Sequence, residues 1–201
     1  MPDFKRKGHP MKHEITSQNT KRMLVDTFLE LLHKKPLSKI TVSEIVNTCH
    51  INRKTFYYHF TDIYDLLEWY LNEKVNETLG AFDLVNDFEK ILQLSQEYIE
   101  KNPFLANCAD DPVGSEKLVH FFSVRTLPFL LEILSRFEQE NNKQLDENYK
   151  YFLADLFAKS SSLSLVEMLK GKNSIDYKQY GVYLSDTFRG ALEGILIKMG
   201  K

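Results

Sequence analysis

A segment of twenty residues, TVSEIVNTCHINRKTFYYHF at positions 41–60, constrains the fold more than any other part of the chain. Thr41 and Glu44 have the spacing of a capping box, in which each side chain satisfies a free amide at the start of a helix. Asn52 is a good N-cap for a second helix. The segment therefore predicts two short helices joined by a tight turn.

The second of these helices has two different faces. Phe56 and Phe60 are four residues apart, so they share a face that is expected in the core. The other face carries cationic, hydroxyl and imidazole groups, which suit DNA phosphates and base edges. These residues are Arg53, Lys54, Thr55, Tyr57, Tyr58 and His59. The pattern predicts a DNA-binding helix-turn-helix, with a capping or core role as the alternative for His59.

The charge is divided unevenly along the chain. Residues 1–60 carry eleven Lys/Arg against five Asp/Glu, while the remainder has a formal charge of −8. A basic head on an acidic body is typical of a DNA-binding domain joined to a sensing or assembly domain. Residues 1–15 are expected to form a flexible basic arm. Its basic residues, Lys5, Arg6, Lys7 and Lys12, are either simply solvated or contact DNA nonspecifically or in the minor groove.

The remaining periodicity predicts an all-α protein, because no strand alternation is flanked by hairpin turns. Helices are expected over about residues 16–33, 63–79, 87–101, 115–140, 147–170 and 176–199, with a turn-rich connector at 104–114. Pro128 is expected to kink the longest helix. These elements suggest a flexible arm (1–15), a helix-turn-helix domain (16–61) and a helical regulatory and dimerisation domain (62–201).

Several functional classes are not supported by the sequence. It has no nucleophile–base pair, metal-binding cluster or phosphate-binding glycine loop, so we expect neither an enzyme nor a metal or cofactor site. Cys49 and Cys108 have no metal or redox spacing. No run approaches the ~18 apolar residues of a membrane span, and no signal peptide precedes the first helix. A cytoplasmic protein without a membrane partner is expected.

The stretch ITVSEIVNTCHINRKTFYYHFTDIYDLL resembles the signature of the TetR family of transcriptional regulators. Its TFYYHF core followed by DLL is more specific than general helix-turn-helix periodicity. The resemblance is strong over about residues 16–72 and architectural beyond them. It implies a three-helix DNA-binding head, a connecting fourth helix, and a helical body that binds a ligand and dimerises. Within the family, FYYHFTDIYDLLEW is most similar to a group that includes regulators of dihydroxyacetone-kinase operons.

The resemblance also implies roles for single residues. Arg53 and Lys54 fall where side chains meet base edges, and Tyr58 can serve at a base or a phosphate. Side chains that commonly contact phosphates are Thr55, Tyr57 and His59, and two further positions that often touch DNA are Thr41 and Ser43.

The sequence departs from the family pattern at two positions. His50 stands in the turn where most members have glycine, at a position suited to a positive φ. Ile63 stands where many members place a lysine against phosphate. The phosphate contact at position 63 is therefore in doubt.

The body contains candidates for a ligand pocket, which should combine aromatic side chains with a few polar groups. They are Trp69, Tyr70, Cys108, His120, Phe121 and Arg125. Aromatic residues at helical spacing are also typical of an ordinary core. Arg125 is the sharpest candidate, because a buried arginine needs an anionic partner, from a ligand or from the chain itself.

The last two helices are candidates for self-association. They combine small residues, which allow close approach of two backbones, with large apolar ones. We expect an isologous dimer interface at Ser161, Leu165, Leu184, Phe188, Ala191, Leu192 and Ile195. Packing within one chain is the alternative.

Together these features predict a dimeric, sequence-specific regulator that binds double-stranded DNA, a repressor released by a small-molecule effector. The alternative is an activator or adaptor whose helical body binds a protein coregulator. The sequence does not indicate the operator, the effector, the regulated genes or the sign of regulation, and Met11 is an alternative start.

Overall fold

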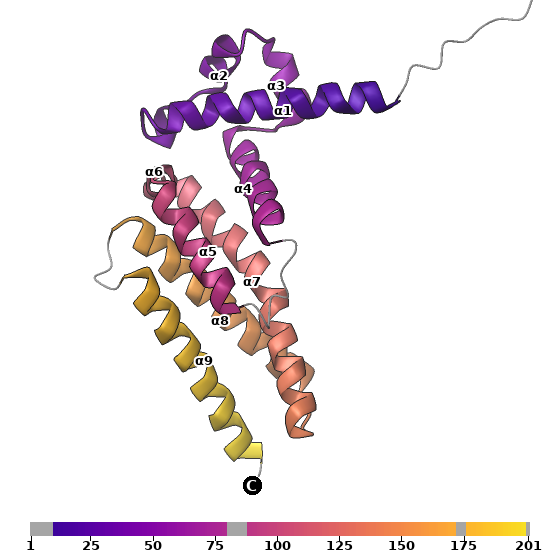
Figure 1. The fold of residues 1–201 in the computed structure, drawn as a ribbon, viewed down its shortest axis with the longest axis vertical. Helices are drawn as coiled ribbons and strands as arrows, with labels where there is room; N and C mark the ends of the chain where they lie inside the picture. Colours follow the sequence, from indigo (N-terminus) through magenta and orange to yellow (C-terminus); the bar gives the residue numbers. More distant parts are fainter. Residues whose placement is uncertain (1–9, 80–87, 172–175, 200–201) are drawn as a thin grey trace, which may run out of the picture. The chain divides into compact units, whose positions relative to one another are not determined.

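The computed structural model describes residues 10–79, 88–171 and 176–199, and all elements in these ranges are helices (Figure 1). The elements are α1 (Pro10–Leu32), the 3-10 helix η1 (Leu37–Lys39), α2 (Val42–Thr48), α3 (Arg53–His59), α4 (Ile63–Leu79), α5 (Phe88–Lys101), α6 (Phe104–Asp110), α7 (Pro112–Asn141), α8 (Glu147–Leu169) and α9 (Tyr177–Met199). The predicted all-α fold is confirmed. The chain forms two compact units, a head (Met1–Tyr70) and a body (Leu71–Lys201), whose boundary falls inside α4.

The first helix begins earlier than the sequence predicts. Helix α1 starts at Pro10, so residues 10–15 of the expected arm are helical. Residues 1–9, with Lys5, Arg6 and Lys7, and the side chain of Lys12 lie outside the described part of the chain.

The head is built around side chains that are almost entirely inaccessible to solvent. Phe28 and Phe56 are fully buried and Phe60 is 2% exposed, as their helical spacing predicts. Leucine, isoleucine and valine side chains from α1, α2 and α4 complete this core, namely Leu24, Leu32, Ile45, Val46, Leu66 and Leu67. Each large apolar side chain contributes about 1.5–3 kcal/mol when fully buried, so the core holds the short helices α2 and α3 in place.

The two short helices are capped as the sequence predicts, with one difference. The Thr41 hydroxyl accepts the amide of Glu44 at 3.2 Å, and the Asn52 side chain accepts the amide of Lys54 at 2.8 Å. The Glu44 carboxylate forms an ion pair with Lys35. The expected capping box is therefore half formed, because the carboxylate joins α2 to the segment after α1.

The turn between α2 and α3 requires an uncommon backbone conformation. His50 has a φ of 53°, in the left-handed region, and Ile51 donates its amide to the carbonyl of Val46 at 3.0 Å. A non-glycine residue in this region is strained, although histidine tolerates it better than a β-branched residue does.

The body is organised by the packing of α7 against α8, with α6 and α9 beside them. Leu130 and Leu134 of α7 and Ala154 and Ala158 of α8 belong to its apolar core, which also includes Leu145, Leu153 and Ile195. At the α7–α8 turn, Glu138 accepts the Leu145 amide and Lys150 Nζ, both at 2.7 Å. Burial alone would raise the pKa of Glu138, but these hydrogen bonds and the charge of Lys150 lower it below its ordinary value.

The prediction that residues 104–114 form a turn-rich connector is wrong. Residues 104–110 form α6, in which Phe104, Leu105, Cys108 and Ala109 are buried on one helical face. The Asp111 side chain then accepts the amide of Gly114 at 2.7 Å and caps α7, three residues before the predicted start at 115. A short helix and the capped start of α7 thus replace the expected loop.

Helix α7 runs from Pro112 to Asn141 and continues through Pro128. Its length and composition alone would allow it to cross a membrane. In the body, however, Leu118, Phe121, Leu130 and Leu134 bury its inner face. A core helix meets the same criteria of length and composition, and α7 is the one helix among the described residues that meets them.

Candidate DNA interface and body cavity

The predicted DNA-binding residues are gathered on α3 and the start of α2. Tyr57 and Tyr58 are 48% and 71% exposed, and Arg53 and Lys54 are also exposed. Thr55 and His59 are half-buried, while Thr41 and Ser43 are exposed on the neighbouring helix. The caps and the buried Phe56 explain this arrangement, because they fix α3 with its polar face toward solvent.

Three of these side chains form a connected cluster. Arg53 Nη1 donates to Ser43 Oγ at 3.4 Å, and Arg53 Nη2 donates to Tyr57 Oη at 3.1 Å. The guanidinium carbon also lies 5.5 Å from the centroid of the Tyr57 ring, within the range of a cation–π contact. The sequence places Arg53 and Tyr57 one turn apart but does not reveal that Ser43 of α2 meets the same guanidinium.

His59 lies at the other end of α3. Its ring meets the edge of Tyr58 with centroids 4.9 Å apart. Burial, and then the positive charge of Lys21 on α1, lower the pKa of His59 below its ordinary value. A histidine with a lowered pKa is mostly neutral near pH 7, so it can still donate one N–H to a phosphate but adds little positive charge.

Trp69 belongs to the head. Its ring lies 6.0 Å from that of Phe60, and Lys21 Nζ is 5.3 Å from the Trp69 centroid. The sequence predicts Trp69 as part of a ligand pocket, whereas the structure packs it against the core of the DNA-binding unit. Lys21 was missed, because only the fold brings it from α1 to this aromatic pair.

The other predicted pocket residues are not gathered around one cavity. Tyr70, Cys108 and Phe121 are buried in the apolar packing, and His120 is exposed. Burial, with the nearby charge of Asp111, raises the pKa of Cys108 to about 12, so its thiol stays protonated.

Arg125 has a different environment from the expected one. Its guanidinium is exposed, donates to Asn72 Oδ1, and lies 5.8 Å from the Phe121 ring centroid. The premise that Arg125 is buried is therefore wrong. A neutral amide and an aromatic ring take the place of the expected anionic partner in these contacts.

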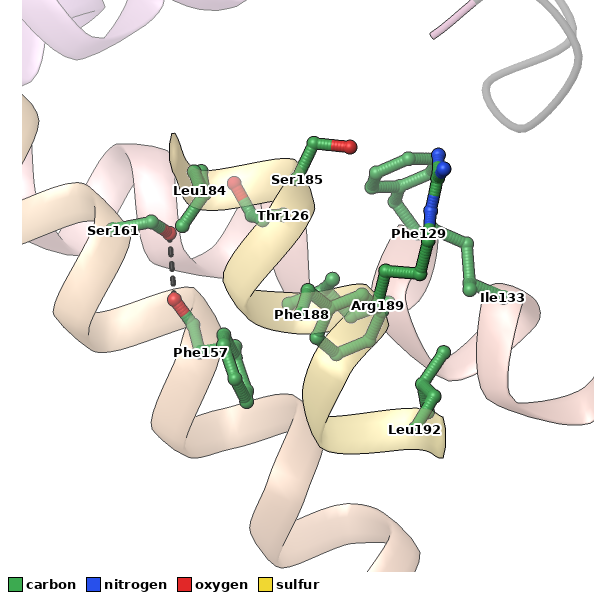
Figure 2. Close-up of a pocket in the computed structure, with 11 residues that line it drawn as sticks. Thr126, Phe129, Ile133, Phe157, Ser161, Leu184, Ser185, Phe188, Arg189 and Leu192 are labelled. Carbon is green, nitrogen blue, oxygen red and sulfur yellow. Dashed lines mark hydrogen bonds between the residues drawn. The ribbon is translucent and has the colours of Figure 1, made fainter. Parts of the chain in front are cut away.

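The body contains a cavity of about 220 Å³ between α7, α8 and α9 (Figure 2). Phe157 of α8 and Phe188 of α9 meet edge to face, with centroids 4.7 Å apart. Its lining comprises Thr126, Phe129, Leu130, Ile133, Phe157, Ser161, Leu184, Ser185, Phe188, Arg189 and Leu192. None of the six residues predicted for a ligand pocket lines it.

The residues predicted for the dimer interface are placed mainly inside the body. Ser161, Leu184, Phe188 and Leu192 line the cavity, and Ile195 belongs to the core. Leu165 and Ala191 are half-buried. The outer face of α8 instead carries exposed apolar side chains at helical spacing, namely Tyr149, Phe152, Leu156 and Leu163. We call these four residues the α8 stripe.

The comparison with known families identifies the head. Residues 24–69 match the model for bacterial regulatory proteins of the tetR family. This part of the chain, the head, is therefore similar to bacterial regulatory proteins of the tetR family. The matched residues contain the capped α2–α3 pair and the whole Arg53 cluster, so the family match and the exposed polar face concern the same part of the molecule.

A relative outside the solved structures is named as a transcriptional activator. The "HTH-type dhaKLM operon transcriptional activator DhaS" of Lactococcus lactis is 23% identical over 143 residues, which cover 71% of this chain and 74% of that protein.

Solved structures show the same fold. "Dihydroxyacetone kinase operon activator DhaS" has a TM-score of 0.62 at 20% identity, covering 87% of this chain and 96% of that one. Thermus thermophilus FadR, a repressor solved in complex with lauroyl-CoA, has a TM-score of 0.58 at 16% identity and covers 84% and 92% of the two chains.

Proposed function

We propose that this regulator binds operator DNA as a homodimer and reads the sequence through α3. The observation that supports this most directly is the exposed Arg53 cluster. A guanidinium has five N–H donors, and two of its nitrogens contact Ser43 and Tyr57. Donors remain for a base edge, and a bidentate contact to guanine is the most common specific arginine contact. Lys54, which is also exposed on α3, stays with Arg53 as a candidate for a base edge.

The remaining exposed groups of the head suit the DNA backbone. Tyr58 is exposed on α3, and Thr41 is exposed at the start of α2. Phosphate contacts fix the position of a protein on the duplex while carrying little direct sequence information. We assign these groups, with Thr55 and His59, to positioning α3 in the major groove.

A dimer is proposed because one α3 helix of seven residues gives a small footprint. Twofold symmetry doubles this footprint on a near-palindromic site. The α8 stripe is the proposed contact surface, together with exposed Val182, Tyr183 and Ile197 of α9. Gly190 and Gly194 of α9 have open space where a Cβ would lie, which permits close approach of a second backbone.

A substitution in the α8 stripe tests this dimer. Leu156→Glu should weaken self-association at least tenfold in analytical ultracentrifugation at micromolar concentration, because it places an unpaired charge in an apolar contact. Leu156 is 47% exposed, so the fold should tolerate the change. Tyr151→Glu is the matched control, since Tyr151 is equally exposed on another face of α8. A monomeric unaltered protein, or equal behaviour of the two variants, contradicts the proposal.

For the mode of regulation, we propose a repressor released by a small-molecule effector bound in the body cavity. The alternative is an activator or adaptor whose body binds a protein coregulator, and the similarity to activators named DhaS favours it. Co-purification distinguishes the two: a small molecule in the body supports the first, and an empty body with a stable protein partner supports the second. Either way, we place the protein in the cytoplasm with its DNA.

A further inference from the structure

The lining of the body cavity is mostly apolar. Seven of its residues are aliphatic or aromatic, three carry hydroxyl groups, and Arg189 is the only charged one. The cavity of about 220 Å³ equals the liquid volume of about seven water molecules. Water is poorly held where it finds few polar partners, so such a lining favours an apolar occupant.

The hydroxyl groups of the lining offer little to a ligand. Thr126 Oγ1 donates to the carbonyl of Phe122 at 2.8 Å, and Ser161 Oγ donates to that of Phe157 at 2.6 Å. Both hydroxyl protons are thus used within their own helices, as Figure 2 shows for Ser161. Hydrogen-bond donors for a ligand must therefore come mainly from lining residues other than Thr126 and Ser161.

Arg189 supplies such donors. Its side chain extends from the exposed side of α9 at the edge of the lining (Figure 2). In the part of the chain that the structure describes, no hydrogen bond or ion pair involves it. Asp186 and Glu193, three and four residues away on α9, are exposed, and neither forms an ion pair with Arg189 in the described part of the chain. An apolar chamber with one unpaired guanidinium at its edge matches a ligand with a hydrocarbon part and one anionic group.

We propose that the cavity between α7, α8 and α9 binds a small amphipathic carboxylate. Its hydrocarbon part lies against Phe157, Phe188 and Leu192, and its carboxylate pairs with Arg189. This inference rests on the proposed effector-responsive regulator and names the class of its effector. A ligand with several phosphates fits less well, because a single cation lines the cavity.

Octanoate is a suitable probe, titrated into the full-length protein by isothermal calorimetry. We expect saturable binding with one site per chain, and much weaker binding of octan-1-ol, which has the same chain without the charge. Arg189→Gln should weaken octanoate binding at least tenfold, equivalent to about 1.4 kcal/mol. Arg189→Glu should abolish octanoate binding and allow octylamine to bind instead.

Lys198→Gln is the matched control, because Lys198 is an exposed cation of the same helix that does not line the cavity. It should leave octanoate affinity unchanged. The inference is overturned if octanoate binding does not saturate, or if Arg189→Gln and Lys198→Gln behave alike.

DNA binding by the same variants, without octanoate, separates this inference from the proposed function. The probe is a duplex selected from a random pool by the unaltered protein. Arg189→Gln should bind this duplex normally. DNA binding without octanoate binding overturns the ligand class alone, whereas octanoate binding without any selected duplex overturns the proposed regulator and leaves the site standing.

Discussion

The head and the body of this protein differ in how directly their sequences determine their surfaces. In the head, capping side chains and fully buried aromatic residues lie within a few positions of the groups they orient. Helix α3 illustrates this. Asn52 caps it, Phe56 anchors it in the core, and Arg53 is therefore held on its exposed face. In the body, the corresponding contacts join residues on different helices, such as Phe157 of α8 and Phe188 of α9. Local signals therefore determine the functional face of the head but not that of the body.

The largest expected effect tests this contrast in packing. Phe56→Ala removes a fully buried ring from the head and should lower the free energy of unfolding by about 3–5 kcal/mol. Phe188→Ala, at a half-buried ring beside the cavity, should lower it by less than half as much, because little tight packing is lost. Urea unfolding followed by circular dichroism and by Trp69 fluorescence measures both. Equal losses would show that α9 packs as tightly as the head.

The fold was largely predictable from the sequence, because helix boundaries depend on local signals. The caps at Thr41 and Asn52 and the burial of Phe56 and Phe60 are predicted and observed, although Phe60 follows α3 with an extended backbone. The segment at 104–114 misled the prediction, because its proline and acidic residues resemble a loop. Asp111 instead ends α6 and caps α7, and Pro112 lies in the first turn of α7.

The functional surfaces of the body were less predictable. The sequence indicated α8 and α9 for self-association, but apolar periodicity cannot tell which apolar face a neighbouring helix covers. Phe188 and Leu192 line an internal cavity, while Phe152 and Leu156 stay exposed. The sequence places Trp69 in a pocket of the body for a related reason. No residue pattern close to Trp69 indicates its contacts with Phe60 and Lys21.

A smaller effect tests how closely the head's functional groups are coupled. If Arg53 reads a guanine edge, Arg53→Ala should cost about 1–3 kcal/mol of binding and relax the preference at one base pair of each half-site. The sequence alone gives Tyr57 a phosphate contact, whose loss would weaken all sites equally. The observed Arg53–Tyr57 hydrogen bond instead predicts that Tyr57→Phe partly relaxes the preference at the same base pair.

Selection of sites from a random duplex pool measures the base preferences of each variant. Tyr58→Phe is the control, because the ring of Tyr58 contacts His59 rather than Arg53. A uniform loss of affinity in Tyr57→Phe, with base preferences unchanged, would return Tyr57 to the role of a phosphate contact.

The smallest expected effect compares two turns, one in each unit, that require a positive φ. His50 in the head and Asn142 in the body have φ values of 53° and 49°. Asparagine adopts this conformation more readily than most residues, so strain should be greater at His50.

His50→Gly relieves this strain but also increases the entropy of the unfolded chain, which offsets about 0.4–1 kcal/mol of the gain in stability. We expect the free energy of unfolding to change by no more than about 1 kcal/mol in His50→Gly and by less in Asn142→Gly. His50→Val should be clearly destabilised, because a β-branched side chain fits poorly at a positive φ. Thermal unfolding of the three variants measures this order, and a His50→Val protein as stable as the unaltered one would show that the turn is not constrained by its backbone conformation.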